Sequence, residues 1–445
     1  MRIIVISFVT PASENIRGTS ALPYHLMKGC LSSVLPRKEE DSDVNDNDNV
    51  DSSHEMIIYS FNSNKLSDEK IREVEKELGV AIKLIPLPKW YQWMFKLHLL
   101  FLRIVLKYPF VNYIVLPKQY VQEIEAQNPD LIWVMGEELS RIVKQFPNHQ
   151  RIQIGPDTES LYYYRLMGCR FVMKDALNYW KCALMYRKYA RMEREFCTDE
   201  NFTYYAVGEE DVRHLQQLNP KVRAKFLRHP HYEVCTQKSQ KNCLTQISQI
   251  SQINKEREGA FHQPKIKVLI AGQYNLYMKQ DGDLLIKSLT PTPSPKEKGI
   301  EDFLQKHYSF TFLGKGWEKH VETLRNAGYE VEHIKFAPDY IKEICKHDIQ
   351  ITPISIGTGT KGKVLDALAN GLLVIGTPYA LENIAVKHGE SCIEYRHPQE
   401  VIAVLEDIPN NIQKYEMMAA EGRKQVLTQH DRALVSSQLF NLVKQ

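Results

Sequence analysis

Few features of membrane-spanning, secreted or nucleic-acid-binding proteins occur in this sequence. Lysine and arginine outnumber aspartate and glutamate by only 57 to 54, a small excess for a chain whose main partner would be a nucleic-acid backbone. The eight cysteines form no CxxC pair and no zinc spacing, which indicates reduced thiols in a reducing compartment. No uninterrupted apolar run reaches about 20 residues, and the N-terminus lacks the features of a signal peptide. We therefore expect a cytoplasmic protein that neither spans a membrane nor binds nucleic acid.

Short apolar runs alternate with helical patterns along all 445 residues, enough chain for two to three domains of about 150 residues each. Strands are predicted at 2–8, 56–60, 81–86, 130–135 and 151–154, and again at 265–271, 309–313, 329–334, 348–353, 372–376 and 392–395. Helices are predicted between most of them, for example at 20–31, 68–78, 176–197 and 362–369. This alternation is typical of parallel sheets covered on both faces. Because it occurs twice, we predict an α/β protein with two doubly wound, Rossmann-like domains.

Two polar stretches indicate where the chain leaves these domains. Residues 236–264 are rich in Gln, Ser and Lys without a clear period, which is typical of a linker or surface insertion. Residues 39–55 hold eight acidic residues and no Lys or Arg, which favours a solvated insertion. We therefore predict an N-terminal domain at 1–235, a linker at 236–264 and a C-terminal domain at 265–445, whose last helix can cross back to the N-terminal domain.

The most informative segment follows the strand predicted at 348–353. A loop with Gly357 and Gly359 leads to Lys361 and Lys363, where a helix begins. Backbone N–H groups at a helix N-terminus suit a phosphate, and lysines there can neutralise a diphosphate. Asp366, within the helix, could accept hydrogen bonds from ribose hydroxyls. The spacing is neither that of a P-loop nor GxGxxG, so these residues alone support a phosphate site and an ordinary glycine-rich turn about equally.

The run from Thr352 to Glu394 also resembles the C-terminal signature of the retaining, GT-B-fold glycosyltransferases of family 4 (glycosyl transferases group 1). The matching residues are Gly357, Gly359, Lys361, Gly362, Lys363, Asp366, Ala367, Ala369, Gly371, Val374, Ile375, Ala380 and Glu382. Weaker similarity covers the first strand with Gly18-Thr19-Ser20, residues 127–134, residues 157–161 with Arg165, and residues 265–272. The sequence departs from the family at Asp366, Thr358, Ser355 and Pro156, where relatives usually have Glu, Glu, Arg and His.

The resemblance implies a GT-B fold, in which two Rossmann-like domains face each other across a cleft. It implies that the N-terminal domain binds a saccharide or lipid-linked saccharide acceptor, through Gly18, Thr19 and Asp157. The implied donor site for a nucleotide-sugar comprises Gly272, Gly357, Gly359, Lys361, Asp366, Ala380, Leu381 and Glu382, with Lys361, Lys363 and Asp157 as catalytic residues. The implied reaction transfers a sugar with retention, in the biosynthesis of a bacterial surface polysaccharide or glycolipid.

The resemblance also implies an enzyme that needs no cofactor and no metal, since the nucleotide-sugar is itself a substrate. No DxD pair lies in a predicted loop of the donor domain, because Asp281-Gly-Asp283 opens a predicted helix. Two alternatives stay open at this point. One is a GT-B sugar-nucleotide epimerase, and the other is a non-catalytic GT-B binding module, which the departures at Asp366, Thr358 and Ser355 would suit.

Residues 80–120 form an unusually basic and aromatic segment, with six Lys or Arg and no Asp or Glu. On one helix from Lys89 to Lys107, the basic positions Lys89, Lys96, Arg103 and Lys107 would fall within about 40° of each other. A narrow basic stripe on an apolar helix is typical of an interfacial helix on anionic lipid. A core helix with a solvated basic edge is equally compatible. The lipid interpretation would place the protein at the inner face of the membrane.

Overall fold

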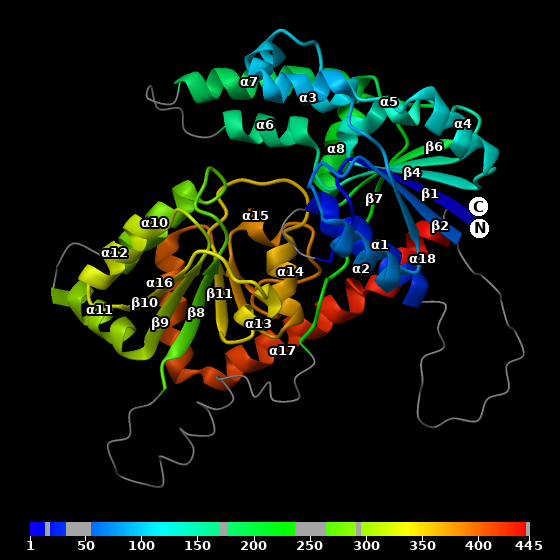
Figure 1. Ribbon diagram of the computed structural model, residues 1–445. Coiled ribbons are helices and arrows are strands. Elements are labelled where there is room, and N and C mark those ends of the chain that lie inside the picture. The colour runs from blue at the N-terminus through cyan, green and yellow to red at the C-terminus, as the bar shows by residue number, and fades with distance from the viewer. Residues whose placement is uncertain (14–17, 33–54, 169–175, 236–263, 291–294, 442–445) are drawn as a thin grey trace, which may run out of the picture. The chain divides into compact units, whose positions relative to one another are not determined.

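The computed structural model describes residues 1–13, 18–32, 55–168, 176–235, 264–290 and 295–441. The chain divides into two compact units, Met1–Pro230 with Arg432–Gln445, and His231–Asp431 (Figure 1). Most of the predicted acidic insertion and of the predicted linker, residues 39–54 and 236–263, lie outside the described residues. No helix in the described ranges combines the length and the hydropathy that a membrane span needs.

The first unit is built on a seven-stranded sheet with the order β3-β2-β1-β4-β5-β6-β7, and all its strand pairs are parallel. The strands are β1 (Arg2–Ser7), β2 (Glu55–Ser60), β3 (Ala81–Leu84), β4 (Leu131–Met135), β5 (Arg151–Gly155), β6 (Phe202–Ala206) and β7 (Ala224–Phe226). The last two were not predicted, although all five residues of β6 are buried. The strand order reverses between β1 and β4, which is the topological switch point of this sheet.

Helices flank this sheet in the first unit. They are α1 (Gly18–Ser32), α2 (Asp68–Leu78), α3 (Lys89–Lys96), α4 (Lys118–Ala126), α5 (Ser140–Val143), α6 (Glu159–Met167), α7 (Ala176–Arg194), α8 (Glu209–Leu218) and α18 (Arg432–Asn441), with the 3-10 helices η1 (Leu99–Ile104), η2 (Phe110–Tyr113) and η3 (Glu137–Leu139). Helix α2 shows why the sequence pattern was readable: Ser67 caps its start, Gly79 adopts φ 60° after its end, and the buried positions Ile71, Val74 and Leu78 share one face.

The C-terminal helix α18 belongs to the first unit, where it packs on α1. The Ser436 hydroxyl donates to the carbonyl oxygen of Leu26 at 2.7 Å. A Cβ at Gly29 would lie 2.4 Å from the carbonyl oxygen of Arg432, so the two helices approach each other where α1 has no side chain. Phe440 of α18 also contacts Trp133 of β4, with ring centroids 5.9 Å apart. Through these contacts, α18 packs against α1 and β4 in the core of the first unit.

The second unit has a six-stranded sheet with the order β10-β9-β8-β11-β12-β13, again entirely parallel. Its strands are β8 (Ile266–Ala271), β9 (Tyr308–Leu313), β10 (Glu330–Ile334), β11 (Ile349–Thr352), β12 (Leu373–Gly376) and β13 (Ile393–Glu394). Its helices are α10 (Lys279–Leu289), α11 (Pro295–His307), α12 (Glu318–Asn326), α13 (Tyr340–Ile344), α14 (Gly362–Ala369), α15 (Pro378–Leu381), α16 (Pro398–Asp407), η5 (Ile408–Asn410) and α17 (Ile412–Gln429). The strand order reverses between β8 and β11.

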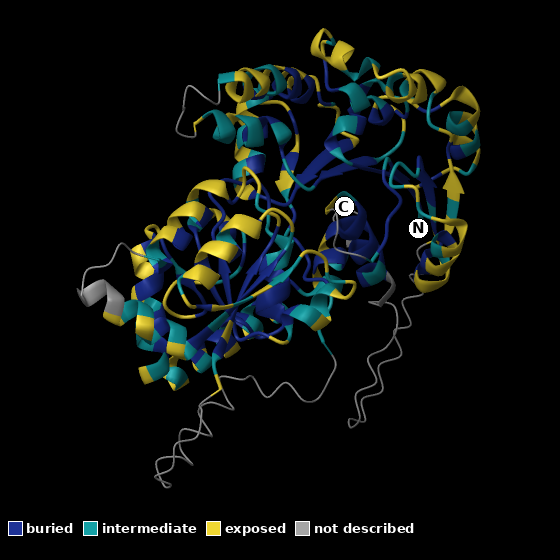
Figure 2. Cartoon of the chain, turned by 60° about the vertical axis from the view of Figure 1, so that its left-hand side comes forward, coloured by how far each residue is buried: buried dark blue, intermediate teal, exposed yellow. Residues whose placement is uncertain are grey.

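The central strands of both sheets are fully buried, as Figure 2 shows by their dark blue colour. Residues 3–6 of β1 and 373–375 of β12 each have no exposed surface. Helices on both faces of a parallel sheet produce this continuous burial. The prediction of an α/β protein with two doubly wound, Rossmann-like domains is confirmed.

The predicted helix from Lys89 to Lys107 is wrong. Helix α3 ends at Lys96, His98 has φ 53°, and the chain continues as the 3-10 helix η1. Beyond this interruption, the ammonium group of Lys188 of α7 donates to the carbonyl oxygens of Arg103, Ile104 and Leu106. A side chain more than 80 residues away in the sequence thus contacts the chain at the end of η1. The 40° basic stripe does not form.

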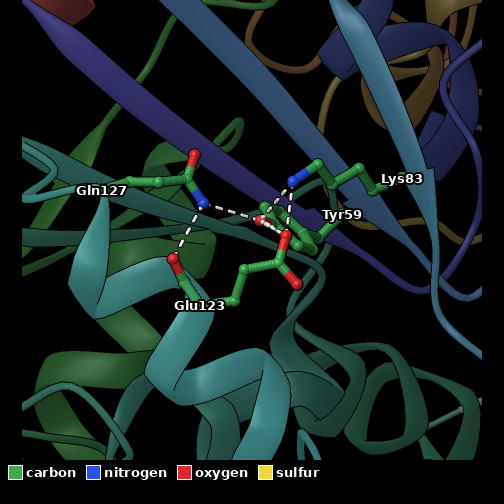
Figure 3. A network of polar contacts seen from close by, with 4 residues as sticks. All are labelled: Tyr59, Lys83, Glu123 and Gln127. Atoms are coloured by element: carbon green, nitrogen blue, oxygen red, sulfur yellow. Dashed lines mark hydrogen bonds and ion pairs between the residues drawn. The ribbon is translucent and has the colours of Figure 1, made fainter.

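Lys83, another basic residue of this segment, takes part in the fold (Figure 3). Its ammonium group pairs with the Glu123 carboxylate and donates to the Tyr59 hydroxyl at 3.4 Å. That hydroxyl donates to Glu123 at 2.8 Å and accepts from Gln127 at 2.7 Å. The hydrogen bond with Glu123 is the main cause that raises the pKa of Lys83. The network ties β2, β3 and α4 together, so Lys83 does not add to a free basic surface.

Candidate active site

Four of the predicted donor residues, Gly272, Gly357, Gly359 and Lys361, follow the strands at the switch point of the second sheet. Gly272 follows β8, while Gly357 and Gly359 lie in the glycine–lysine loop, defined here as residues 353–361 between β11 and α14. Strands β8 and β11 are neighbours, and ligands of open α/β sheets bind outside the carboxyl ends of the strands at this point. Two sequence segments about 85 residues apart are thus placed at one edge.

Lys361 is held over its own loop. Its Nζ donates to the carbonyl oxygens of Thr358 at 2.5 Å and Gly359 at 3.1 Å. A Cβ at Gly357 would lie 2.5 Å from Cε of Lys361 and 2.7 Å from its Nζ, so this glycine leaves the space that the lysine occupies. Gly359 has φ +61°, a conformation that glycine adopts at no steric cost. The loop therefore fixes the ammonium group of Lys361, the residue that directly precedes α14.

Asp366 lies on the buried face of α14, with no exposed surface. Burial lowers the pKa of Lys363, and the negative charge of Asp366 opposes that shift. Nζ of Lys363 lies 5.5 Å from the ring centroid of Tyr340. Burial first, and Asp366 second, raise the pKa of Tyr340 and of Tyr232. Asp366 and Lys363 thus belong to a cluster with two tyrosines, in which Asp366 and Tyr232 are buried and Lys363 and Tyr340 half-buried. The ribose contact of Asp366 stays a prediction.

Ala380 and Leu381 have a packing role in the structure. Both side chains are buried, at 0% and 8% exposure. Their amide groups donate to the carbonyl oxygen of Thr377 at 2.9 and 3.2 Å, and the Thr377 hydroxyl donates to the carbonyl oxygen of Ile354 at 2.6 Å. Helix α15 is thereby fastened to the start of the glycine–lysine loop. Neither residue has a side chain or an amide left to face a donor in this conformation.

Glu382 follows α15 and is half-buried. The next residue, Asn383, donates from Nδ2 to the carbonyl oxygen of Gly359 at 3.3 Å. The segment that carries Glu382 therefore contacts the glycine–lysine loop, as a donor site assembled from both would require.

Ser355 joins the glycine–lysine loop to α10. Its amide donates to the carbonyl oxygen of Tyr277 at 2.6 Å, and its hydroxyl accepts from the amide of Asp281 at 2.9 Å. Asp283, one turn into the same helix, accepts from the Tyr274 hydroxyl at 2.6 Å. The Asp281-Gly-Asp283 pair therefore lies in a helix and binds protein groups. Among the described residues, no three His, Cys, Asp or Glu side chains are grouped as metal ligands would be.

Two further glycines at this edge were missed from the sequence. Gly314 and Gly316 follow β9 with φ +147° and +93°. A Cβ at Gly314 would lie 2.2 Å from the carbonyl oxygen of Gly272, the same oxygen that accepts from Nε1 of Trp317 at 2.8 Å. The loops after β8 and β9 therefore touch backbone to backbone. The run Leu-Gly-Lys-Gly directly after a predicted strand was the available signal.

The predicted acceptor residues meet in a pocket of the first unit. Its volume is about 320 Å³, and Gly18, Thr19 and Asp157 all line it. The remaining lining residues follow the carboxyl ends of β1, β4 and β5 or lie nearby: Phe8, Val9, Ser63, Val111, Met135, Gly136, Glu137, Glu138, Leu139, Pro156 and Glu159. The pocket thus occupies the switch point of the first sheet, as the glycine–lysine loop does in the second.

Carboxylates that the sequence analysis did not select dominate this pocket. Glu137, Glu138 and Glu159 line it together with Asp157, and these four residues define the acidic pocket. Burial is the main cause that raises the pKa of Glu159 to about 8, followed by the charges of Asp157, Glu138 and Glu193. Burial and the charges of Glu193, Glu159 and Glu138 raise the pKa of Glu137 well above its usual value. The available signal was the Glu-Glu pair shortly after the strand at 130–135.

An apolar surface surrounds α3 and η1. A second pocket, of about 470 Å³, is lined by Trp90, Trp93, Met94, Leu97, Leu99, Leu106, Phe110 and Tyr113. Trp93 and Phe101 are each 61% exposed, and Val105 is 80% exposed. Of the predicted membrane contacts Lys89, Lys96, Arg103 and Lys107, the last is paired with Glu195 at 3.6 Å. Exposed aromatic residues beside basic ones are therefore present without the predicted continuous helix.

Comparisons with known proteins agree with this architecture. Residues 297–440, which include the glycine–lysine loop, match the family model described as "Glycosyl transferase-like". No curated protein matches the chain. Similar solved structures include Anabaena HepE in complex with UDP-glucose, with a TM-score of 0.60, 11% identity and coverage of 100% of this chain and 99% of that one.

Two further structures cover all of this chain. Sucrose-phosphate synthase from Thermosynechococcus elongatus has a TM-score of 0.60 and 10% identity over 98% of its own chain. WaaG, a glycosyltransferase involved in lipopolysaccharide biosynthesis, has a TM-score of 0.53 and 13% identity over 99% of its chain. At these identities the likeness shows the fold. The chain therefore has the GT-B fold, and its residues 297–440 match a glycosyl transferase-like family.

Proposed function

We propose that this protein transfers a sugar, with retention, from a nucleotide-sugar to a saccharide or lipid-linked saccharide acceptor. The observation that carries the proposal is the position of Lys361. Its ammonium group is held by the carbonyl oxygens of its own loop, directly before the N-terminus of α14. That place combines a fixed cation with the positive end of a helix, which suits the diphosphate of a donor.

The same arrangement supplies a mechanism for departure of the nucleoside diphosphate. Negative charge grows on the leaving phosphate as the glycosidic bond breaks, and a preorganised cation stabilises the transition state more than the ground state. We assign this task to Lys361 and to the amide groups at the start of α14. We expect Lys363 to contribute less than Lys361, because burial lowers its pKa and so disfavours its charged form. The proposed reaction needs no bound metal, so we expect turnover to survive chelation by EDTA.

UDP-sugars are the first donors to test. Support comes from the structural neighbour HepE, which has been solved in complex with UDP and with UDP-glucose. In this chain, we propose that Gly272, Gly357, Gly359 and the segment of Glu382 surround the nucleotide. Asp366 would reach the ribose only if its buried cluster opened.

The acceptor is proposed to bind the first unit, at the pocket lined by Gly18, Thr19 and Asp157. We keep Asp157 as a candidate catalytic residue because it lies after β5 at the switch point, where reacting groups of such sheets are found. A role in surface polysaccharide or glycolipid biosynthesis would fit an acceptor that stays attached to a lipid.

A lipid-linked acceptor would be reached from the membrane surface. We propose that the apolar surface around α3 and η1 rests on anionic lipid, with Trp93, Phe101 and Val105 inserted and Lys89, Lys96 and Arg103 near the headgroups. Vesicle sedimentation tests this: phosphatidylglycerol vesicles should bind the protein and phosphatidylcholine vesicles should not. Trp93→Ala with Lys96→Ala should weaken binding, whereas Lys424→Ala, on exposed helix surface of the second unit, should not.

A donor screen tests the proposed reaction itself. The protein would be incubated with single nucleotide-sugars and a mixture of acceptor saccharides, while released nucleoside diphosphate and the anomeric form of the product are measured. We expect release with one donor class, with retained configuration and in the presence of EDTA. Activity lost to EDTA and restored by Mn²⁺ would contradict the electrostatic mechanism, and an inverted product would contradict retention.

A further inference from the structure

The apolar pocket beside α3 has the size and the lining of a binding site for a hydrocarbon chain. Its volume is about 470 Å³, roughly three times that of an apolar cavity of about 150 Å³ that can hold benzene. All eight lining residues are apolar or aromatic. The one side-chain hydroxyl among them, that of Tyr113, accepts from the amide of Tyr108 at 3.4 Å. A saccharide or a nucleotide would lose hydrogen bonds to water here without replacing them, whereas a hydrocarbon chain would not.

The walls of this pocket differ in how firmly the fold holds them. Four lining residues share one face of α3 and its C-terminal cap at the helical spacing i, i+3, i+4 and i+7: Trp90, Trp93, Met94 and Leu97 (Figure 1). Across from them, Phe110 of η2 contacts the ring of Trp90 at a centroid distance of 5.2 Å, and Tyr113 packs against the core of the first unit. Leu97, in contrast, is 58% exposed. The pocket therefore has one side fixed to the fold and one side open to a ligand.

Two lysines border the apolar face of α3. Lys89 and Lys96 are the first and last residues of this helix, and both are exposed. At about 100° per residue, they lie within about 20° of each other and about 40–60° from Trp93. Arg103 of η1 is also exposed, and residues 80–120 contain no Asp or Glu. An anionic group beside the pocket would therefore meet positive charge, and no carboxylate of this segment would repel it.

We propose that this pocket binds the hydrocarbon chain of the acceptor lipid, with the phosphate group of that lipid near Lys89 and Lys96. Adsorption to a bilayer needs only an exposed apolar surface with basic residues, whereas a pocket of this volume can enclose a single chain. A chain with a phosphate head matches both the apolar lining and the basic border, while an apolar face of a second copy would match the lining alone. The inference rests on the proposed function, because a lipid-linked acceptor supplies both the chain and the phosphate.

Calorimetry with alkyl phosphates below their micelle concentrations tests this inference on the full chain. Decyl phosphate should bind at one site per protein, and inorganic phosphate should not bind there. Hexyl phosphate should bind more weakly, by about four-fold for each methylene group removed. Decyltrimethylammonium has the same chain with a cationic head and should bind at least about ten-fold more weakly than decyl phosphate, because the neighbouring lysines repel it.

Two variants at exposed positions separate the pocket from the surface around it. Leu97→Trp adds a larger apolar side chain at the pocket, so decyl phosphate should bind at least about ten-fold more weakly while binding to phosphatidylglycerol vesicles is kept. Val105 is exposed and does not line the pocket, so Val105→Asp should weaken vesicle binding and keep the affinity for decyl phosphate. If Leu97→Trp fails to fold, fluorescence replaces it: decyl phosphate brominated at its terminal carbon should quench tryptophan emission less in Trp93→Phe than in the wild type.

Several results would overturn the inference. They are equal affinity for decyl and hexyl phosphate, binding of decyl phosphate without saturation, and an unchanged affinity in Leu97→Trp. A ligand-free dimer in sedimentation equilibrium that Val105→Asp dissociates would also overturn it, because a second copy would then cover this face. A parallel titration with UDP keeps the proposed function separate. UDP binding without chain binding overturns this inference alone, and absence of nucleotide binding contradicts the proposed function, whatever the alkyl phosphates do.

Discussion

The two switch points of this molecule have the same architecture and opposite chemistry. In the second unit, the loop after β11 presents Gly357, Gly359 and Lys361 before a helix. In the first unit, the corresponding edge presents the four carboxylates of the acidic pocket. The sheet places both sites, but the residues of the loops decide whether basic or acidic side chains lie there. The fold therefore indicates where ligands bind, and the side chains indicate which ligands.

The largest effect should come from removing the cation of the second unit. Lys361→Ala should lower kcat/KM for the donor. The expected rise in activation free energy is about 2.7–4 kcal/mol, the typical cost of losing one group that stabilises transition-state charge. Steady-state kinetics with the best donor measures this. Lys424→Ala, an exposed lysine of α17 in the same unit, should leave the kinetics unchanged. Equal rates in Lys361→Ala and the wild type would remove the contrast between the two switch points.

Asp366 sharpens the comparison, because it is a buried acidic residue on the helix that follows Lys361. Asp366→Asn should lower the free energy of unfolding by about 1–3 kcal/mol, since a buried group loses its charged interaction with Lys363. Urea denaturation measures this loss. A nucleotide dissociation constant that rises as well would support the ribose contact. An unchanged dissociation constant would assign Asp366 to the stability of α14 alone.

A smaller effect is expected when Lys361 is displaced rather than removed. In Gly357→Ala the new Cβ would lie 2.5 Å from Cε of Lys361, so the flexible end of the lysine must move away from its carbonyl partners. Nucleotide affinity should fall, by less than in Lys361→Ala. Gly299→Ala is the matched control, because nothing lies within 4 Å of its Cβ position. Unchanged affinity in Gly357→Ala would show that the lysine need not be held by the loop.

The acidic pocket should make the free energy of unfolding depend on pH. Burial raises the pKa of Glu159 to about 8 in the folded protein, so the folded state keeps a proton that the unfolded state has lost above its ordinary pKa. The free energy of unfolding should therefore fall as the pH rises from about 4.5 to about 8. In Glu159→Gln, thermal denaturation should show a flatter dependence over that range. Parallel curves for both proteins would mean that Glu159 is ionised in the fold.

Sequence reasoning selected Gly18, Thr19 and Asp157 of the acidic pocket. It missed the three glutamates of that pocket for a physical reason. Gly357, Lys361 and α14 are contiguous, and the helix was predicted with its observed bounds, 362–369. Glu137, Glu159 and Glu193 come from three separate elements, and only tertiary packing brings them together. The spacing of basic residues at 89–107 likewise did not reveal the interruption at His98, which has φ 53° between α3 and η1. Local patterns identify strands, caps and loops, whereas long-range partners are not visible in them.

The most direct test of the account is a calorimetric titration of UDP into the wild type, Lys361→Ala and Lys424→Ala. The account predicts that UDP binds the wild type and Lys424→Ala with the same affinity, and Lys361→Ala at least ten-fold more weakly. The same affinity in all three proteins would contradict the central claim that the glycine–lysine loop of the second unit binds the donor diphosphate.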